Sequence, residues 1–147
     1  MRDLLGRLQE LATALERRLD WLPPAAARLG GGWVFVLSGW GKLHNLEGVV
    51  QFFRDLGIPA PELQAPFVAG TELACGALLL AGLGTRLAAL PLIAVMCVAL
   101  ATALRERIGS LSDLFGLSEF LYVVLLVGLL VFGAGRVSLD AVARKVL

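Results

Sequence analysis

The stretch Glu72-Leu-Ala-Cys-Gly-Ala-Leu-Leu-Leu-Ala-Gly-Leu-Gly-Thr-Arg86 lies at the centre of a long apolar segment, residues 65–104. Glu72 is the only carboxylate in the apolar run 65–83, and a second run, 87–104, follows the turn. At about 1.5 Å of rise per residue, each run can cross a hydrocarbon layer of roughly 30 Å. The sequence therefore predicts a helical hairpin in a membrane. A very apolar soluble bundle is the alternative, but it requires a polar helix face, and residues 87–104 offer none.

The composition favours the same class of protein. Of 147 residues, 58% are hydrophobic and 17% are charged, and the mean hydropathy of +0.81 is typical of membrane proteins. The net charge of +1 indicates no basic surface, so we expect the lipid bilayer rather than nucleic acid as a partner. Cys75 and Cys97 form no C-x-x-C pair, which gives a disulfide framework, a thiol-exchange centre or a zinc site little support.

The hairpin and the apolar runs on either side of it together predict an all-α, integral membrane four-helix bundle with antiparallel spans. We expect spans at residues 25–43, 65–83, 87–104 and 117–135, within a membrane domain of residues 25–147. Residues 1–22 repeat leucine at three- and four-residue spacing, which predicts an amphipathic helix along the lipid interface. Packing of this helix on a partner protein is the competing interpretation.

The distribution of Lys and Arg predicts the orientation in the membrane. Four spans place both termini on one side, and that side holds nine of these residues against four on the other. The side richer in Lys and Arg is normally cytoplasmic. We therefore expect a multi-pass protein of the plasma (inner) membrane with both termini in the cytoplasm.

Small residues indicate how the spans pack. One face of the first span has small residues in its middle and a cation at each end; its members are Arg28, Gly32, Phe35, Gly39 and Lys42. In the hairpin, Gly70 with Ala74 and Ala77 with Ala81 have the small-x-x-x-small spacing that brings helices together. We expect Pro91 in about the first turn of the third span, where its missing N–H matters least.

Three ionisable residues fall at similar depths in the outer third of the bilayer. Glu72 lies roughly 18 Å from the cytoplasmic turn, and Lys42 and Glu119 lie roughly 24 Å from the cytoplasmic ends of their spans. We expect Lys42 to contact Glu72, with Glu119 close by, because an isolated charge in lipid costs at least ~2.5–3.5 kcal/mol. One interpretation is an ion pair that fixes the packing of two spans. The other is a polar pocket, open to the outer leaflet, that binds a quinone-like headgroup or relays a proton.

The sequence offers little support for cofactors held by the chain alone. His44 is the only histidine. The chain therefore cannot bind a haem through two histidines, one on each side, and His44 alone is a weak candidate for a metal ligand. No P-loop or G-x-S-x-G pattern occurs. We expect no metal site, a quinone as the candidate ligand, and catalytic residues that the sequence does not identify.

Four short motifs together resemble the DoxX family over residues 28–140. They are Gly39-Trp-Gly-Lys42-Leu43, Gly57-Ile-Pro59-x-Pro61, Glu72-Leu-x-x-Gly76 with Gly82-x-x-Thr85-Arg86, and Gly133-Ala-Gly-Arg136-Val-Ser-Leu-Asp140. The resemblance implies a compact four-helix membrane protein that works beside redox enzymes; the family is named after a small subunit of an archaeal thiosulfate:quinone oxidoreductase. It marks Lys42, Glu72 and Arg86 as motif positions without assigned chemistry. The long N-terminal helix exceeds what the family core needs.

The leading hypothesis is a DoxX-like inner-membrane subunit that supports a quinone- or thiol/sulfur-linked partner enzyme. Such a chain is an accessory subunit of a soluble or membrane oxidoreductase rather than a stand-alone enzyme. The alternative is a non-catalytic membrane scaffold or assembly factor that works through residues 1–22. A small transporter is disfavoured because four spans make a narrow bundle. The sequence does not determine whether the chain forms a homo-oligomer.

Overall fold

The computed structural model describes residues 13 and 18–146, and this part of the chain is all-helical, with no strand. Most of the expected amphipathic helix at residues 1–22 lies outside the described residues. In chain order the elements are α2 (Leu22–His44), α3 (Leu46–Asp55), α4 (Pro61–Ala81), α5 (Thr85–Ala101), the 3-10 turn η1 (Arg105–Arg107), α6 (Leu111–Gly116), α7 (Ser118–Phe132) and α8 (Leu139–Val146).

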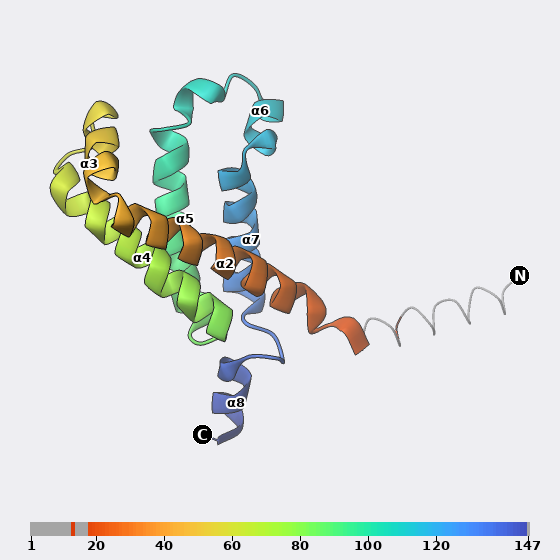
Figure 1. Cartoon of the computed structure of the whole chain (residues 1–147). Coiled ribbons are helices and arrows are strands. Elements are labelled where there is room, and N and C mark those ends of the chain that lie inside the picture. Colours follow the sequence, from red (N-terminus) through yellow and green to blue (C-terminus); the bar gives the residue numbers. More distant parts are fainter. Residues whose placement is uncertain (1–12, 14–17, 147) are drawn as a thin grey trace, which may run out of the picture.

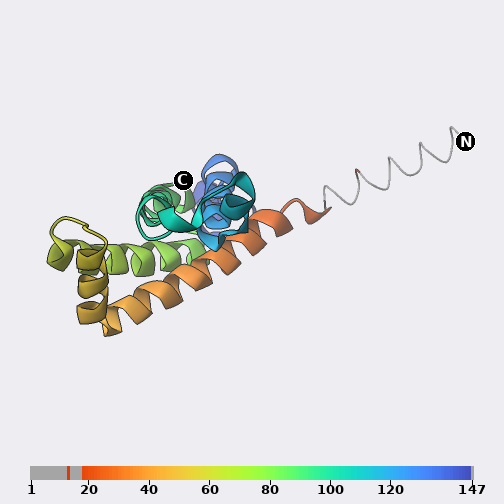
Figure 2. The same cartoon turned by 90° about the horizontal axis from the view of Figure 1, so that it is seen from above.

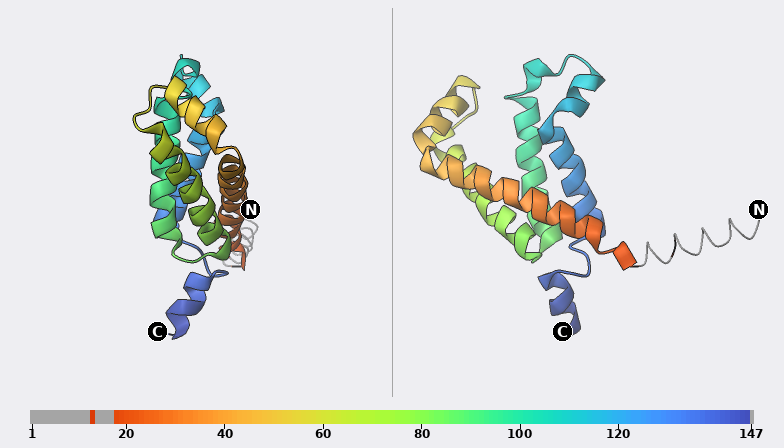
Figure 3. Two further views of the ribbon diagram at one scale, coloured as in Figure 1. Left: turned by 60° about the vertical axis from the view of Figure 1, so that its left-hand side comes forward. Right: turned by 45° about the vertical axis from the view of Figure 1, so that its right-hand side comes forward.

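Four of these helices form the body of the molecule as two packed pairs. Helix α2 packs along α4, and α5 packs along α7 (Figure 1). Seen from above, α5 and α7 lie together on one side of the α2–α4 pair (Figure 2). The α4–α5 turn and the end of α7 lie at one end of the body, while α3 and α6 lie at the other. Helix α8 extends beyond the end that carries the α4–α5 turn (Figure 3).

Glycine lets α2 and α4 approach to backbone contact. A Cβ atom on Gly39 would lie 2.5 Å from the backbone nitrogen of Leu73, and one on Gly76 would lie 2.8 Å from that of Val36. Either distance is too short for a real side chain. The buried residues of α2 include Arg28, Gly32, Phe35 and Gly39, so the face that the sequence indicated is the packing face.

The small-residue pairs expected to pack the hairpin lie on the wrong face. Ala74, Ala77 and Ala81 are exposed, and a Cβ atom on Gly70 would meet nothing within 4 Å. The residues of α4 that are buried are Ala65, Ala69, Glu72, Gly76 and Leu79. The spacing rule failed because α4 is small and apolar on several faces, so spacing alone does not select one.

The core joins the two helix pairs. Its largest fully buried side chains include Phe35 of α2, Leu79 of α4, Leu92 of α5, and Leu126 and Leu129 of α7. The ring of Phe35 also packs against that of Tyr122, with centroids 5.6 Å apart. Each of the four long helices therefore contributes to one continuous core.

Glycine also sets the ends of the helices. Gly82 and Gly84 have φ of +67° and +58°, which a residue with a side chain rarely adopts, so they make the tight α4–α5 turn. Gly133, with φ of +79°, ends α7 at Phe132, which is earlier than the 135 expected from the sequence. Pro91 lies inside α5, which begins at Thr85; its expected place in the first turn was wrong because the helix starts before the apolar run does.

Among the described residues, α4 alone is both long and apolar enough to cross a membrane by itself. Helices α5 and α7 are apolar but shorter, with 17 and 15 residues against the about 20 that are typical of a membrane span. Helix α2 has 23 residues but is less apolar.

Candidate functional site

The structure brings together Lys42 of α2 and Glu72 of α4. The Lys42 Nζ lies 2.6 Å from Oε1 and 2.7 Å from Oε2 of Glu72, so the ammonium binds both carboxylate oxygens. The hydroxyl of Ser38 donates a third hydrogen bond to Oε2, at 2.9 Å. The Glu72 side chain is 1% exposed and that of Lys42 is 29% exposed. The buried carboxylate thus has a direct cationic partner that reaches toward the surface.

The close approach of α2 and α4 makes this pair. Gly39 contacts the α4 backbone at Ala69 and Leu73, directly beside Glu72. Ser38 and Lys42 are four residues apart on α2, so both side chains lie on one face of that helix. Because Gly39 has no side chain, this face reaches the α4 carboxylate. Sequence analysis missed Ser38, although its four-residue spacing to Lys42 is a signal that could have found it.

The Lys42–Glu72 pair lies in the wall of a cavity of about 510 Å³ between α3, α4 and α5. This volume falls within the roughly 300–1,000 Å³ of small-molecule sites in proteins. The lining is mostly apolar and includes Phe52 and Phe53 of α3 and Met96 of α5. Its polar side chains are Lys42, Gln64, Thr71 and Glu72. The cavity, called the α3–α5 cavity below, therefore combines an apolar interior with a few polar groups.

Exposed apolar side chains line the mouth of the α3–α5 cavity. Phe52, Phe67 and Val98 belong to its lining, yet they are 50%, 72% and 51% exposed. The cavity thus opens on an apolar part of the surface. A lysine ammonium has three N–H donors, and two suffice for the Glu72 contacts, so one remains for a ligand. The arrangement suits an amphiphile with a hydrogen-bond acceptor on an apolar body.

Glu119, the third residue of the expected pocket, does not line this cavity. It lies in the first turn of α7, and its carboxylate accepts a hydrogen bond from Ser118 at 3.1 Å. His44 is exposed at the end of α2, where its Nδ1 donates to the carbonyl of Trp40 at 2.9 Å. The described residues hold no cluster of three His, Cys, Asp or Glu side chains suited to a metal.

A second buried polar cluster, called the turn cluster below, lies at the other end of α2. Arg28 Nη2 donates to the carbonyl of Val137 at 2.6 Å, and Nη1 to that of Leu80 at 3.4 Å. Asp140 accepts from the backbone nitrogens of Gly84 at 2.7 Å and Thr85 at 3.1 Å. Arg28 and Asp140 also attract each other electrostatically. The turn cluster joins the starts of α2, α5 and α8.

Two more motif residues, Gly82 and Arg86, lie near the turn cluster. Gly82 is buried, and a Cβ atom there would collide with the Arg28 guanidinium. The backbone nitrogen of Asp140 donates to the carbonyl of Gly82 at 2.9 Å. Arg86 is exposed and donates through Nη2 to the carbonyl of Val131 at 3.0 Å. Asp140 belongs to one of the sequence motifs, but the sequence predicted no role for it. The backbone N–H groups that its carboxylate binds, those of Gly84 and Thr85, lie more than 50 residues away along the chain.

Comparisons with known proteins agree with the resemblance seen in the sequence. The family model described as DoxX matches residues 24–105, which include Arg28, Ser38, Lys42, Glu72 and Arg86. A protein of Bacillus subtilis (strain 168) named "Putative oxidoreductase CatD" is 30% identical over 116 residues, covering 78% of this chain and 81% of that protein. No solved structure matches the chain.

Proposed function

We propose a function from the premise that this chain belongs to the DoxX family, a family of membrane proteins. In this proposal the chain is an accessory subunit of the inner membrane that supports a partner oxidoreductase. It binds a quinone or similar amphiphile in the α3–α5 cavity, with the headgroup at Lys42. The name of the Bacillus relative supports a redox setting, and the cavity supports a small amphiphilic ligand.

The membrane placement in this proposal uses α2, α4, α5 and α7 as four antiparallel spans. All four carry large apolar side chains on their outer faces, which suit lipid and are costly in water. Strongly exposed examples are Trp33 and Trp40 on α2, Phe67 on α4, Leu87 on α5 and Val131 on α7. The excess of Lys and Arg near the chain ends supports cytoplasmic termini. The α3–α5 cavity then faces the outer leaflet.

The observation that carries the proposal is a buried ion pair in the wall of an apolar cavity. A pair that only joined two helices would need no adjoining space, whereas Lys42 keeps 29% of its side chain exposed and lines the α3–α5 cavity. Glu72 and Ser38 fix the position of the ammonium. A quinone carbonyl accepts the remaining N–H, and the ring lies among apolar side chains. The chain positions the quinone, and the partner enzyme carries out electron transfer.

Binding of a short-chain quinone tests this function directly. The full chain, reconstituted in nanodiscs, is titrated with decylubiquinone and binding is measured calorimetrically. We expect Glu72→Gln to lower the affinity about tenfold, equivalent to ~1.4 kcal/mol, because Lys42 loses its anionic anchor. Glu119→Gln is the matched control, since it makes the same chemical change outside the cavity, and its affinity should stay within about twofold of wild type. Equal affinities for the two variants would exclude this site.

A further inference from the structure

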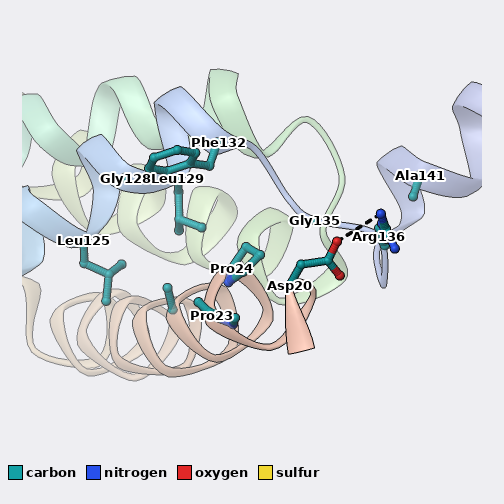
Figure 4. Close-up of a pocket in the computed structure, with 11 residues that line it drawn as sticks. Asp20, Pro23, Pro24, Leu125, Gly128, Leu129, Phe132, Gly135, Arg136 and Ala141 are labelled. Carbon is teal, nitrogen blue, oxygen red and sulfur yellow. Dashed lines mark ion pairs between the residues drawn. The ribbon is translucent and has the colours of Figure 1, made fainter. Parts of the chain in front are cut away.

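A second groove lies where the start of α2 meets the end of α7 (Figure 4). Its volume is about 910 Å³, and side chains such as Pro24 and Ala27 of α2 and Leu125, Leu129 and Phe132 of α7 form its walls. Asp20 and Arg136 form an ion pair of 3.0 Å at its rim. We call this feature the α2–α7 groove. It is apolar along the helices and charged at one end only.

The apolar part of the α2–α7 groove has room for an added chain. A Cβ atom on Gly128, which lines the groove, would meet no atom within 4 Å. In the proposed membrane placement the groove lies between two spans, where water finds too few hydrogen-bond partners to fill it. An acyl chain fills such a space at little cost. A membrane lipid therefore suits the apolar part of the groove, because its acyl chains can fill that space.

The charged end of the groove offers donors for an anion. The Arg136 side chain is 76% exposed and carries five N–H groups, of which Asp20 engages only part. Within the described part of the chain, the backbone N–H groups of residues 134–138 donate no hydrogen bond. Gly135 and Arg136 of this loop line the groove. A guanidinium beside unpaired backbone N–H groups is the donor set that binds phosphate.

We propose that the α2–α7 groove binds one anionic phospholipid from the cytoplasmic leaflet. Its acyl chains lie along Leu125, Leu129 and Phe132, and its phosphate binds the Arg136 guanidinium and the backbone N–H groups of Gly135 and Arg136. The exposed guanidinium of Arg136 favours an anionic over a zwitterionic lipid. Asp20 opposes the phosphate and competes for Arg136. This inference rests on the proposed membrane placement and is independent of the quinone at Lys42.

Native mass spectrometry of the full chain tests this site. The protein is released from nanodiscs of equal parts phosphatidylglycerol and phosphatidylcholine, and the ratio of the two bound lipids is measured. We expect Arg136→Gln to lower the retained phosphatidylglycerol about fivefold relative to phosphatidylcholine, the effect of one cation at an anionic surface. Asp20→Asn should change the ratio in the opposite direction. Arg105→Gln, at an exposed arginine of η1 between α5 and α6, should leave it unchanged.

A filling variant tests the apolar half separately. Gly128→Leu occupies the groove without backbone strain, and we expect it to lower retention of both lipids while the thermal unfolding temperature stays at or above that of wild type. An unchanged lipid ratio in Arg136→Gln would overturn the headgroup assignment. An unchanged number of bound lipids in Gly128→Leu would show that no lipid occupies the groove. A change of oligomeric state in this variant, without a loss of lipid, would show that a second copy of the chain occupies it. Glu72→Gln should leave these ratios unaltered, so failure of this site and failure of the quinone site are distinguishable.

Discussion

Helix α2 carries a charged side chain near each end, and the two differ in their burial and in their partners. At the end near α5 and α8, Arg28 donates to the backbone carbonyls of Val137 and Leu80. At the end near α3, Lys42 binds the side chain of Glu72. Arg28 is 5% exposed and is packed against Gly82 so tightly that a Cβ atom there would collide with it. Lys42 is 29% exposed and lines a cavity.

This contrast separates a structural cluster from a candidate binding site. Backbone carbonyls cannot leave Arg28 without moving whole segments of chain, so the turn cluster fixes the helices relative to one another. A lysine held by one carboxylate keeps a free N–H and space beside it. The two ends of α2 should therefore respond differently to substitution.

Arg28→Met should have the largest effect on stability. It leaves two carbonyl groups without their charged donor, which should lower the free energy of unfolding by about 3–5 kcal/mol. The exposed Arg86, with one carbonyl partner, provides the control, and Arg86→Met should cost about 1 kcal/mol. Thermal unfolding in a mild detergent measures both. A similar loss of free energy of unfolding in the two variants would show that the buried Arg28 stabilises the fold no more than the exposed Arg86.

Lys42→Met should destabilise the protein by about 3 kcal/mol, because it leaves the Glu72 carboxylate buried without its cation. The double variant Lys42→Met/Glu72→Leu should recover to within about 1 kcal/mol of wild type, since apolar side chains replace a buried pair well. It should still fail to bind decylubiquinone in calorimetry. A double variant that binds the quinone normally would assign the pair to packing alone.

Gly39→Ala should separate α2 from α4 and lower the free energy of unfolding by about 2 kcal/mol, because its Cβ atom would lie 2.5 Å from the Leu73 nitrogen. Gly41→Ala on the same helix is the matched control. A Cβ atom there meets nothing within 4 Å, so this substitution should stabilise the helix by about 0.5–1 kcal/mol. Chemical unfolding should give opposite signs for the two, and equal signs would refute the close helix contact.

Ser38→Ala should have the smallest effect, about 1 kcal/mol, because it removes one of the three hydrogen bonds to Glu72. The quinone affinity should fall two- to threefold, since Lys42 keeps its contacts but Glu72 is less firmly held. The test is the same calorimetric titration. A tenfold loss would make Ser38 a direct ligand of the quinone instead of a positioning residue.

The sequence predicted those features that depend on local spacing. The four-step and three-step spacing from Arg28 to Lys42 identified the packing face of α2, and the glycines at 82 and 84 identified the turn. Similar depths in adjacent spans placed Lys42 beside Glu72. The same reasoning gave the wrong location for Glu119, because residues at equal depth can lie on different sides of the bundle.

Other features could not be predicted because uniformly apolar helices carry little directional signal. In α4 and α5 the outward-facing and core-facing side chains are alike, so Gly70 and Ala74 looked as suitable for packing as Ala69 and Gly76. The bonds of Arg28 and Asp140 go to backbone atoms far along the chain. A backbone group has the same chemistry at every residue, so no sequence pattern marks these partners.

Two of the helices around the α3–α5 cavity contain an internal proline, Pro66 in α4 and Pro91 in α5. Each lacks the N–H that would bind the carbonyl one turn earlier, so each helix bends there at lower cost than elsewhere. Pro91 also belongs to the cavity wall. Two helices around the cavity thus each contain a natural bending point, while α2 and α4 are held in close backbone contact at Gly39 and Gly76. A force that bends α4 or α5 would widen or narrow the cavity before it disturbed the ion pair behind it.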